Sequence, residues 1–456
     1  MMNKTLLFLL GVGNLFLFFT CRKTEKIQSD QYLGIPIVEV QQQLDNLVDL
    51  WYPRIVDSAR GGYLTNFEYD WTKSEEQPKM LVTQARGLWT AARLYQAYPQ
   101  LTELREAADH GYRFLTQTLW DEQLGGYSLH WPASAKERNY RLTYANAFAL
   151  YALAEYAKIN ADPTVLQWVE KTFDWLEENA HDDQANGYYN LVTFENGAND
   201  RSYGAGQSLG WGNGKWKGQN TSIHLLEALT NTYTVLNLPK VQERLEEMLQ
   251  LVRDTFVQEN GSLRLYFTNN WEAVDHRDSS RAFILEHIHD DHVSFGHDIE
   301  TAFLLFEAAN VLKDGNVDAQ TLATCKKMLD HSLQFGFAEQ YQGLFEKGYY
   351  FRDQDGIEVT DRRKSWWAQA EAWHALGLFA ELFPTEAAYQ KGFQQMWRYM
   401  QRYLIDSEHG GWYNYGLDEN PDNVKSKKAH QWKGPYHNGR ALVQVLDYAK
   451  GGTEHH

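Results

Sequence analysis

A glycine followed by a large apolar side chain recurs six times along this chain, at intervals of about 60 to 80 residues. Each occurrence follows a polar or acidic turn and precedes a short extended piece, which is typical of a loop between two helices. The six marks are Gly61-Gly62-Tyr63, Gly125-Gly126-Tyr127, Gly187-Tyr188-Tyr189, a weaker Gly261-Ser262-Leu263, Gly343-Leu344-Phe345 and Gly410-Gly411-Trp412. Each interval has room for two helices of ordinary length and their loops. The spacing therefore predicts six helical hairpins.

Apolar residues between these marks recur at spacings of three and four, as in Leu88, Ala92 and Tyr95, and this period indicates amphipathic helices. Six helical hairpins can close into a ring around a central cavity, which is then the default ligand site. We predict an all-α (α/α)6 barrel as a single domain over residues 36–450, because no Pro/Ser/Gly-rich linker interrupts them. An open helical solenoid is the alternative, and the count of six favours the closed ring.

The composition excludes one class of partner and is compatible with another. A formal charge of −17 and the absence of a basic stripe argue against binding to nucleic acid. The 16 Trp and 27 Tyr offer flat apolar faces that suit pyranose rings, although the same rings can fill a core. Sugar binding is consistent with this composition without being established by it.

The N-terminus has the form of an export signal. Lys4 precedes an apolar run over residues 6–19 that is short for a membrane span and fits a signal peptide. Cys21 then stands where a lipoprotein is acylated, although Thr20 replaces the small residue usual before it. We expect residues 1–21 to be a signal peptide ending at a lipidated Cys21, residues 22–35 to be a tether, and the mature protein to be a periplasmic or membrane-anchored lipoprotein. A cleaved signal with an incidental cysteine is the alternative.

Two segments combine ionisable and aromatic residues at helix starts. In the segment 217–224, His224 follows Asn220 by one helical turn, so both can face the same side. In the segment 290–300, His297 and Glu300 are three residues apart and share a helix face, where the carboxylate can orient the imidazole or bind substrate hydroxyls. The second cysteine, Cys325, has no assignable partner histidine and is expected to be a packed thiol.

Two further segments complete the set. The segment 364–371 begins with the pair Trp366-Trp367, and the segment 432–440 places His437 just after Pro435, which fixes the start of a helix. A lone helical histidine is usually structural. Two of them, each at a helix start beside aromatic residues in different repeats, favour a general acid and base.

A loop rich in histidine and aspartate offers a metal-binding alternative. It contains His287, His289, Asp290, Asp291 and His292. The run lies in one loop and lacks the ligand spacing of known helical zinc motifs. We therefore expect neither a metal nor another cofactor.

Together these segments resemble the N-acylglucosamine 2-epimerase superfamily, and most closely its cellobiose 2-epimerase branch. The resemblance covers residues 36–450, and its most specific pieces are SFGHDIE at 294–300, KSWWAQAE at 364–371 and WKGPYHNGR at 432–440. It implies an (α/α)6 barrel, an oligosaccharide substrate and no metal. A monomer is the expected oligomeric state.

The resemblance also implies residue roles. His297 and His437 match the two histidines that act as general acid and base on opposite faces of C2. Arg86 matches an arginine beside the sugar oxygens, and His224 a third site histidine. The substrate-contacting or orienting positions match Tyr144, Asn220, Glu300, Trp367 and Trp432. One position departs from the family, because Ser222 stands where a histidine is common, and this leaves the natural disaccharide open.

The implied chemistry explains the need for two histidines. The C2 proton of a sugar becomes acidic once ring opening forms a carbonyl at C1, and its removal gives an enediolate. A base on one face and an acid on the other invert C2, while Arg86 and His224 can stabilise the oxyanion without a metal.

Three other functions remain open. A ketose–aldose isomerase of the same superfamily would return the proton to C1. A glycoside hydrolase would need two carboxylates that flank the bond, for which Asp298 and Glu300 lie too close together on one helix. A non-catalytic glycan-binding lipoprotein would not need both His297 and His437.

Overall fold

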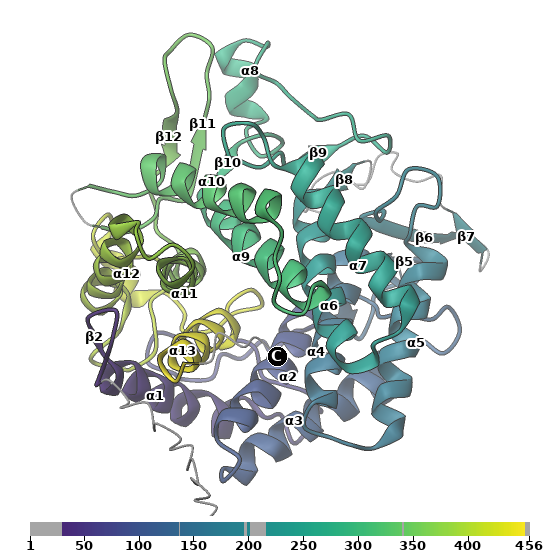
Figure 1. Cartoon of the computed structure of the whole chain (residues 1–456). Helices are drawn as coiled ribbons and strands as arrows, with labels where there is room; N and C mark the ends of the chain where they lie inside the picture. Colours follow the sequence, from purple (N-terminus) through teal and green to yellow (C-terminus); the bar gives the residue numbers. More distant parts are fainter. Residues whose placement is uncertain (1–29, 136, 196–197, 201–215, 340–341, 452–456) are drawn as a thin grey trace, which may run out of the picture.

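The computed structural model describes residues 30–135, 137–195, 198–200, 216–339 and 342–451. Within these residues, six helices form an inner ring and six form an outer ring (Figure 1). The inner helices are α2 (Leu81–Ala97), α4 (Thr143–Ala157), α6 (Gln219–Leu236), α9 (Phe295–Leu312), α11 (Trp366–Leu382) and α13 (Tyr436–Ala449). The outer helices are α1 (Ile37–Ile55), α3 (Thr102–Phe114), α5 (Pro163–Asn179), α7 (Pro239–Leu251), α10 (Ala319–Phe335) and α12 (Ala387–Tyr399).

The inner helices close on themselves. Each packs on the next, from α2 to α4, α6, α9, α11 and α13, and α13 packs back on α2. Each inner helix also packs on the outer helix that follows it, except that α13 takes α1 from the other end of the chain. The predicted (α/α)6 barrel is confirmed, and the open solenoid is excluded because the first and last helices meet.

Apart from β1 and β2, the short strands gather at the end of the barrel where the inner helices begin. Strands β3, β5, β8 and β10 each lead directly into an inner helix. All pairings are antiparallel, in the orders β1-β2, β3-β4, β5-β6-β7, β8-β9 and β10-β11-β12. The strands are β1 (Gln31–Tyr32), β2 (Ile35–Pro36), β3 (Lys79–Met80), β4 (His130–Trp131), β5 (Tyr140–Leu142), β6 (Leu191–Glu195), β7 (Ala198–Asp200), β8 (Lys217–Gly218), β9 (Tyr266–Phe267), β10 (Val293–Ser294), β11 (Lys347–Tyr349) and β12 (Glu358–Asp361).

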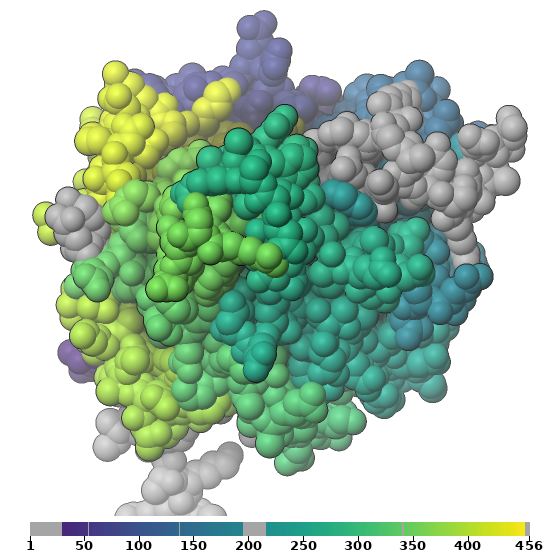
Figure 2. Space-filling view, turned by 90° about the horizontal axis from the view of Figure 1, so that it is seen from above, coloured from purple at the N-terminus to yellow at the C-terminus, as the bar shows by residue number. Residues whose placement is uncertain are grey.

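The long connection between α7 and α9, which we call the excursion, covers part of this end of the barrel. It contains the short helix α8 (Arg281–Glu286), which lies beside β11 and β12 on the face seen in Figure 2. Ile284 of α8 packs on Tyr349 and Phe351, and the Arg281 guanidinium donates to Glu358 at 2.7 Å. The excursion is therefore held against the barrel by both apolar and ionic contacts.

The loops that contain the six glycine marks, including the weak one at Gly261, connect the outer helix of each repeat to the inner ring. In every repeat the large residue of the mark pairs in an isolated bridge with a residue just beyond the outer helix, as Tyr63 pairs with Val56 and Leu263 with Val257. In four repeats a side chain one turn into an inner helix binds the backbone of that residue. These side chains are Gln84, Asn146, Asp298 and Gln369.

The packed domain begins inside the stretch that we assigned to the tether. Strands β1 and β2 form a small hairpin, and Tyr32 and Ile35 are buried. The Tyr32 ring packs on Phe393 and Tyr448, and its hydroxyl donates to the Gly377 carbonyl at 3.2 Å. Burial of these side chains shows that the hairpin packs against the barrel, whose first helix, α1, begins at Ile37. The expected signal peptide, the lipidated Cys21 and most of the tether lie outside the described residues.

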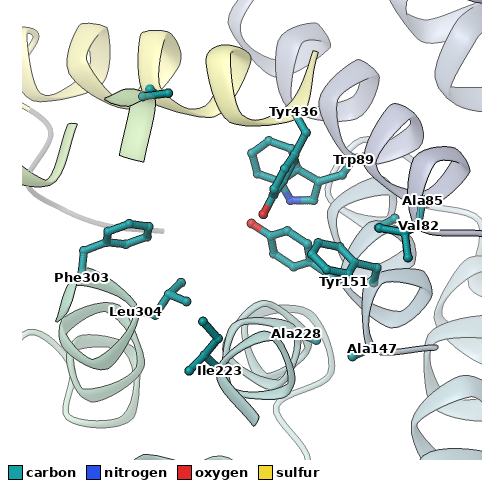
Figure 3. Packing of buried hydrophobic residues seen from close by; sticks show 14 of the residues in the cluster. Val82, Ala85, Trp89, Ala147, Tyr151, Ile223, Ala228, Phe303, Leu304 and Tyr436 are labelled. Atoms are coloured by element: carbon teal, nitrogen blue, oxygen red, sulfur yellow. The ribbon is translucent and has the colours of Figure 1, made fainter. Parts of the chain in front are cut away.

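Aromatic residues fill the middle of the barrel. Trp89, Tyr151 and Tyr436 project from α2, α4 and α13 toward the axis (Figure 3). Trp89 stacks on Tyr151 and meets Tyr436 edge to face, with ring centroids 5.3 and 5.1 Å apart. Part of the aromatic content therefore serves packing rather than ligand binding.

Cys325 is a packed thiol, as expected. It is fully buried, and this burial raises the pKa of the thiol. No helix among the described residues is both long and apolar enough to span a bilayer.

Candidate active site

The first two turns of the inner helices bring the predicted site residues together at one end of the barrel. Arg86 lies on α2, Tyr144 on α4, Asn220 and His224 on α6, His297 and Glu300 on α9, Trp367 on α11 and His437 on α13. The remaining residue, Trp432, lies in the loop before α13. Because all six helices contribute near their N-termini, residues far apart in sequence converge around the barrel axis.

His437 is held by a buried carboxylate. Its Nδ1 lies 2.5 Å from Oε1 of Glu371, a fully buried residue of α11. Glu371 also accepts a hydrogen bond from His374 at 3.0 Å. An ionised carboxylate at Nδ1 fixes the proton on that nitrogen, which leaves the Nε2 lone pair for a substrate proton.

His297 is oriented by a serine and not by Glu300, although orienting this imidazole is one of the two roles considered for that carboxylate. Its Nδ1 is hydrogen bonded to the Ser294 hydroxyl at 2.7 Å, whereas Glu300 binds Arg440 instead. The ring of Trp367 lies 4.8 Å from the His297 ring and 5.8 Å from the His437 ring, measured between centroids. Trp367 thus places the two histidines around one small space.

Arg440 joins three glutamates from three different helices. It binds Glu227 of α6, Glu300 of α9 at 2.8 Å and Glu371 of α11 at 2.7 Å. All four side chains are buried. A buried arginine that shares its charge among several carboxylates fixes their positions, and removing it would leave uncompensated buried charge.

Arg86 and His224 form the third side of the space. The Arg86 guanidinium lies over the Phe148 ring, 4.3 Å from its centroid, and donates to the Tyr144 hydroxyl at 3.2 Å. His224 holds Oε2 of Glu227 through Nδ1 at 2.8 Å. The buried Nε of Arg86 has no hydrogen-bond partner among the described residues, so this cation retains hydrogen-bonding capacity for a ligand.

Burial sets the protonation states of the two histidines. It lowers the pKa of His297 to about 3, assisted by the neighbouring His224 and His292. It also lowers the pKa of His437 to about 4, against the opposing effect of its hydrogen bond to Glu371. Both imidazoles are therefore neutral at neutral pH and able to accept a proton.

A small cavity adjoins this space. It has a volume of about 60 Å³, and Tyr144, Asn220, Tyr266 and Trp432 contribute to its walls. The buried Oδ1 of Asn220 has no hydrogen-bond partner among the described residues. This combination of aromatic walls and a polar atom is typical of a sugar-binding subsite.

The acidic residues suit a guanidinium better than a metal ion. Glu300, Glu371 and His437 bring potential ligand atoms within 4.8 Å of one another. Nη2 of Arg440 is already bonded to Oε1 of both glutamates. A divalent cation would have to sit beside this fixed positive charge, which is electrostatically unfavourable.

Several residues in the predicted segments have structural roles instead. Asp298 accepts from the Leu263 backbone at 3.0 Å and faces His331. Lys217 pairs with Asp182 at 2.7 Å, and Lys364 pairs with Asp418. Asp298 therefore cannot serve as the second carboxylate of a hydrolase while it holds this loop.

The histidine-rich loop lies in the excursion and is held by its own local contacts. His287 stacks on Phe283 with ring centroids 4.0 Å apart, and Nδ1 of His292 bonds to the Ile288 carbonyl at 2.9 Å. Within the described part of the chain, no three acidic or imidazole groups of this loop converge on one point.

Sequence reasoning did not assign four residues that organise the site. They are Glu227, Ser294, Glu371 and Arg440. Glu227 follows His224 by three residues and Ser294 precedes His297 by three, so helical spacing could have suggested both. Glu371 and Arg440 meet only through tertiary packing.

Comparison with known proteins places this arrangement in a family. Residues 62–441 match the family described as N-acylglucosamine 2-epimerase (GlcNAc 2-epimerase). A cellobiose 2-epimerase of Bacteroides fragilis is 28% identical over 423 residues, covering 90% of this chain and 98% of that protein. A D-mannose isomerase of Marinomonas mediterranea is 23% identical over 415 residues, covering 89% and 96%.

A solved structure agrees with these relatives. The cellobiose 2-epimerase of Spirochaeta thermophila superposes with a TM-score of 0.76 at 26% identity, covering 91% of this chain and 96% of that chain. The chain belongs to the N-acylglucosamine 2-epimerase family and is a sugar epimerase or isomerase built on an (α/α)6 barrel.

Proposed function

We propose that this enzyme inverts C2 of the reducing-end sugar of a β-linked disaccharide, interconverting glucose and mannose at that position. The observation that supports it most is the pair of imidazoles from α9 and α13, which share Trp367 and keep Nε2 available for a substrate. The relatives that carry the name cellobiose 2-epimerase support the same reaction.

The proposed reaction begins after the sugar ring has opened. Nε2 of one histidine takes the proton from C2, the C–H electron pair forms the C1–C2 double bond, and the carbonyl oxygen becomes an oxyanion. The second histidine, which takes up a proton from solvent as the oxyanion forms, then gives that proton to the opposite face of C2. The carbonyl forms again, and the first histidine returns its proton to solvent. Negative charge on the enediolate favours the protonated form of the facing imidazole, which offsets the low pKa that each has in the empty site.

Two side chains support the charge that develops. Arg86 keeps a hydrogen-bond donor that has no partner among the described residues, and His224 is fixed by Glu227, so both can face the C1 and C2 oxygens. Preorganised donors of this kind are a main source of rate enhancement in buried sites. The Arg440 cluster positions His437 through Glu371 rather than acting on the substrate, and we propose no role for a metal.

The adjoining cavity, at about 60 Å³, is the place where an edge of the second sugar ring would enter. Trp432, Tyr266 and Asn220 would contact it from the open end of the barrel. Tyr266 lies on β9, outside the motifs that led to the family, and Ser222 is buried on α6. We propose that the residues around this cavity decide which disaccharide is accepted.

An aldose–ketose isomerase is the second candidate, because one relative is a D-mannose isomerase. The two reactions share the enediolate and differ in the carbon that receives the proton. A glycoside hydrolase is disfavoured by the structural role of Asp298.

The decisive experiment is incubation with cellobiose and with mannobiose in heavy water, followed by NMR. Epimerisation should place deuterium at C2 of a product that keeps an aldose end. A ketose product with deuterium at C1 would support the isomerase instead. Cleavage of the glycosidic bond would support a hydrolase, and no turnover of any β-linked disaccharide would contradict the proposal.

We also propose that the chain is exported and anchored through Cys21. The support is the apolar run and the cysteine in the N-terminal sequence.

A further inference from the structure

The barrel contains a larger cavity at the end opposite to the candidate active site. Its volume is about 540 Å³, which lies in the range of small-molecule sites. It is lined by the C-terminal halves of α2, α4, α6, α9 and α13, and Thr234 and Lys450 at its rim are exposed. Glu227 is on its wall, and Tyr436 and Arg440 lie between it and the catalytic histidines.

The walls of this far cavity are charged but balanced. Arg93 pairs with Asp447, and Lys158 pairs with Glu155 at 3.1 Å. Glu155 also accepts hydrogen bonds from the Gln96 and Asn231 amides, at 2.6 and 3.1 Å. The cavity thus presents paired ions and amides rather than one uncompensated charge, which does not suit a strongly charged ligand.

Two features offer hydrogen bonds and a flat surface to a neutral ligand. Trp89 and Tyr151 form a stacked aromatic floor near the barrel axis (Figure 3). Glu307 also faces the cavity, and its burial raises the pKa of this carboxyl to about 7, so a large fraction of it is uncharged near neutral pH.

We propose that the far cavity is a second binding site, for one small uncharged polyhydroxyl molecule such as a monosaccharide. Its lining is of the kind found in sugar sites, namely an aromatic floor, amides and a carboxyl group. The shared residue Glu227 also binds His224 and Arg440, so a molecule bound there touches the carboxylate that supports the catalytic end.

The test measures binding of methyl β-D-glucopyranoside by titration calorimetry. This probe is neutral and cannot open its ring. A saturating concentration of cellobiitol, the reduced disaccharide, occupies the catalytic end during the titration. The wild-type protein should bind about one equivalent of the probe under these conditions.

Two variants fill the cavity from different helices. Val311→Trp on α9 and Gln444→Trp on α13 both change wall residues outside the catalytic cluster. Each should weaken probe binding by at least about tenfold, a difference of about 1.4 kcal/mol. The matched control Val311→Ile adds only one methylene group, so it should bind the probe with the affinity of the wild-type protein. Turnover and circular dichroism of each variant show that it is folded.

Three results would overturn the proposal. One is no binding of the probe by wild type up to about 50 mM. Another is equal binding by wild type and both folded Trp variants, which would place the probe at the catalytic end. The last is tighter binding of glucose 6-phosphate than of the neutral probe, which would contradict the uncharged class. None depends on which sugar the enzyme converts, so failure here is distinguishable from failure of the proposed epimerase function.

Discussion

At the scale of single residues, His297 and His437 carry the proposed chemistry. Replacing either by Ala should lower epimerisation by about 10²–10⁴-fold, the usual contribution of one general acid or base. The fold should survive, because neither imidazole contributes to the apolar core. Steady-state turnover of cellobiose measures the loss. The control is His409→Ala, which removes a partly exposed histidine that pairs with Glu408 and lies outside the candidate site. This variant should retain full activity. Near-normal activity in either site variant would contradict the two-histidine mechanism.

Glu371 is expected to act through His437. Glu371→Gln keeps the shape but removes the charge that fixes the proton on Nδ1, so kcat should fall by about 10²-fold or more while KM changes little. Loss of the carboxylate also removes the interaction that opposes the lowering of the His437 pKa, so that pKa should fall further. A pH–rate profile of the variant against wild type separates this role from general destabilisation. A KM effect alone, with kcat preserved, would assign Glu371 to substrate binding.

The pH dependence of the free enzyme follows from the same two residues. Because the pKa of His297 is lowered to about 3 and that of His437 to about 4, both remain neutral well below the ordinary value of about 6.5. The kcat/KM for cellobiose should therefore stay nearly constant from pH 7 to about pH 5 and fall toward pH 4. Recovery of activity on return to pH 7 controls for acid unfolding. A fall centred near pH 6.5 would show that at least one of the two histidines is not buried as described.

At the scale of elements, the glycine marks fix how each outer helix turns back to the inner ring. Gly62 has φ +63°, and a Cβ there would lie 2.4 Å from Oε1 of Gln84, the side chain that binds Tyr63. Gly315 has φ +85° but nothing within 4 Å. Both Ala variants incur the left-handed backbone cost of about 1–2 kcal/mol, and Gly62→Ala should lose about 1–3 kcal/mol more through overpacking. Thermal unfolding measures the difference. Equal melting temperatures for the two variants would show that the contact with Gln84 does not hold the loop.

At the scale of the whole molecule, the first described residues lie far from the catalytic end. Tyr32 packs against Tyr448 near the C-terminal end of α13, whereas His437 is at its N-terminal end. If Cys21 is acylated as we propose, the catalytic mouth faces away from the membrane. Cys21→Ala should then release the protein from the membrane fraction with kcat/KM unchanged. Intact mass of the wild-type protein should show a chain that begins at acylated Cys21, and a chain beginning at Met1 in the cytoplasm would contradict export.

The periodic features of the sequence determined the class of fold. Glycine marks and apolar spacing are local properties, because a helix period or a left-handed glycine depends on neighbouring residues alone. They were sufficient to predict six hairpins, and the family motifs supplied His297, His437, Arg86 and His224 as site residues. The packed hairpin before the barrel was not predicted, since the burial of Tyr32 depends on helices near the other end of the chain.

Only the tertiary structure decided which side chains of the site bind one another. Arg440 binds carboxylates that are 69, 140 and 213 residues away along the chain, and no local pattern encodes such distances. For the same reason the sequence left two roles open for Glu300, orienting His297 or binding substrate hydroxyls. The ring closure of the barrel brings Arg440 to Glu300 and leaves Ser294 to orient the imidazole. The far cavity has the same origin, because it exists only where five helices meet around an axis.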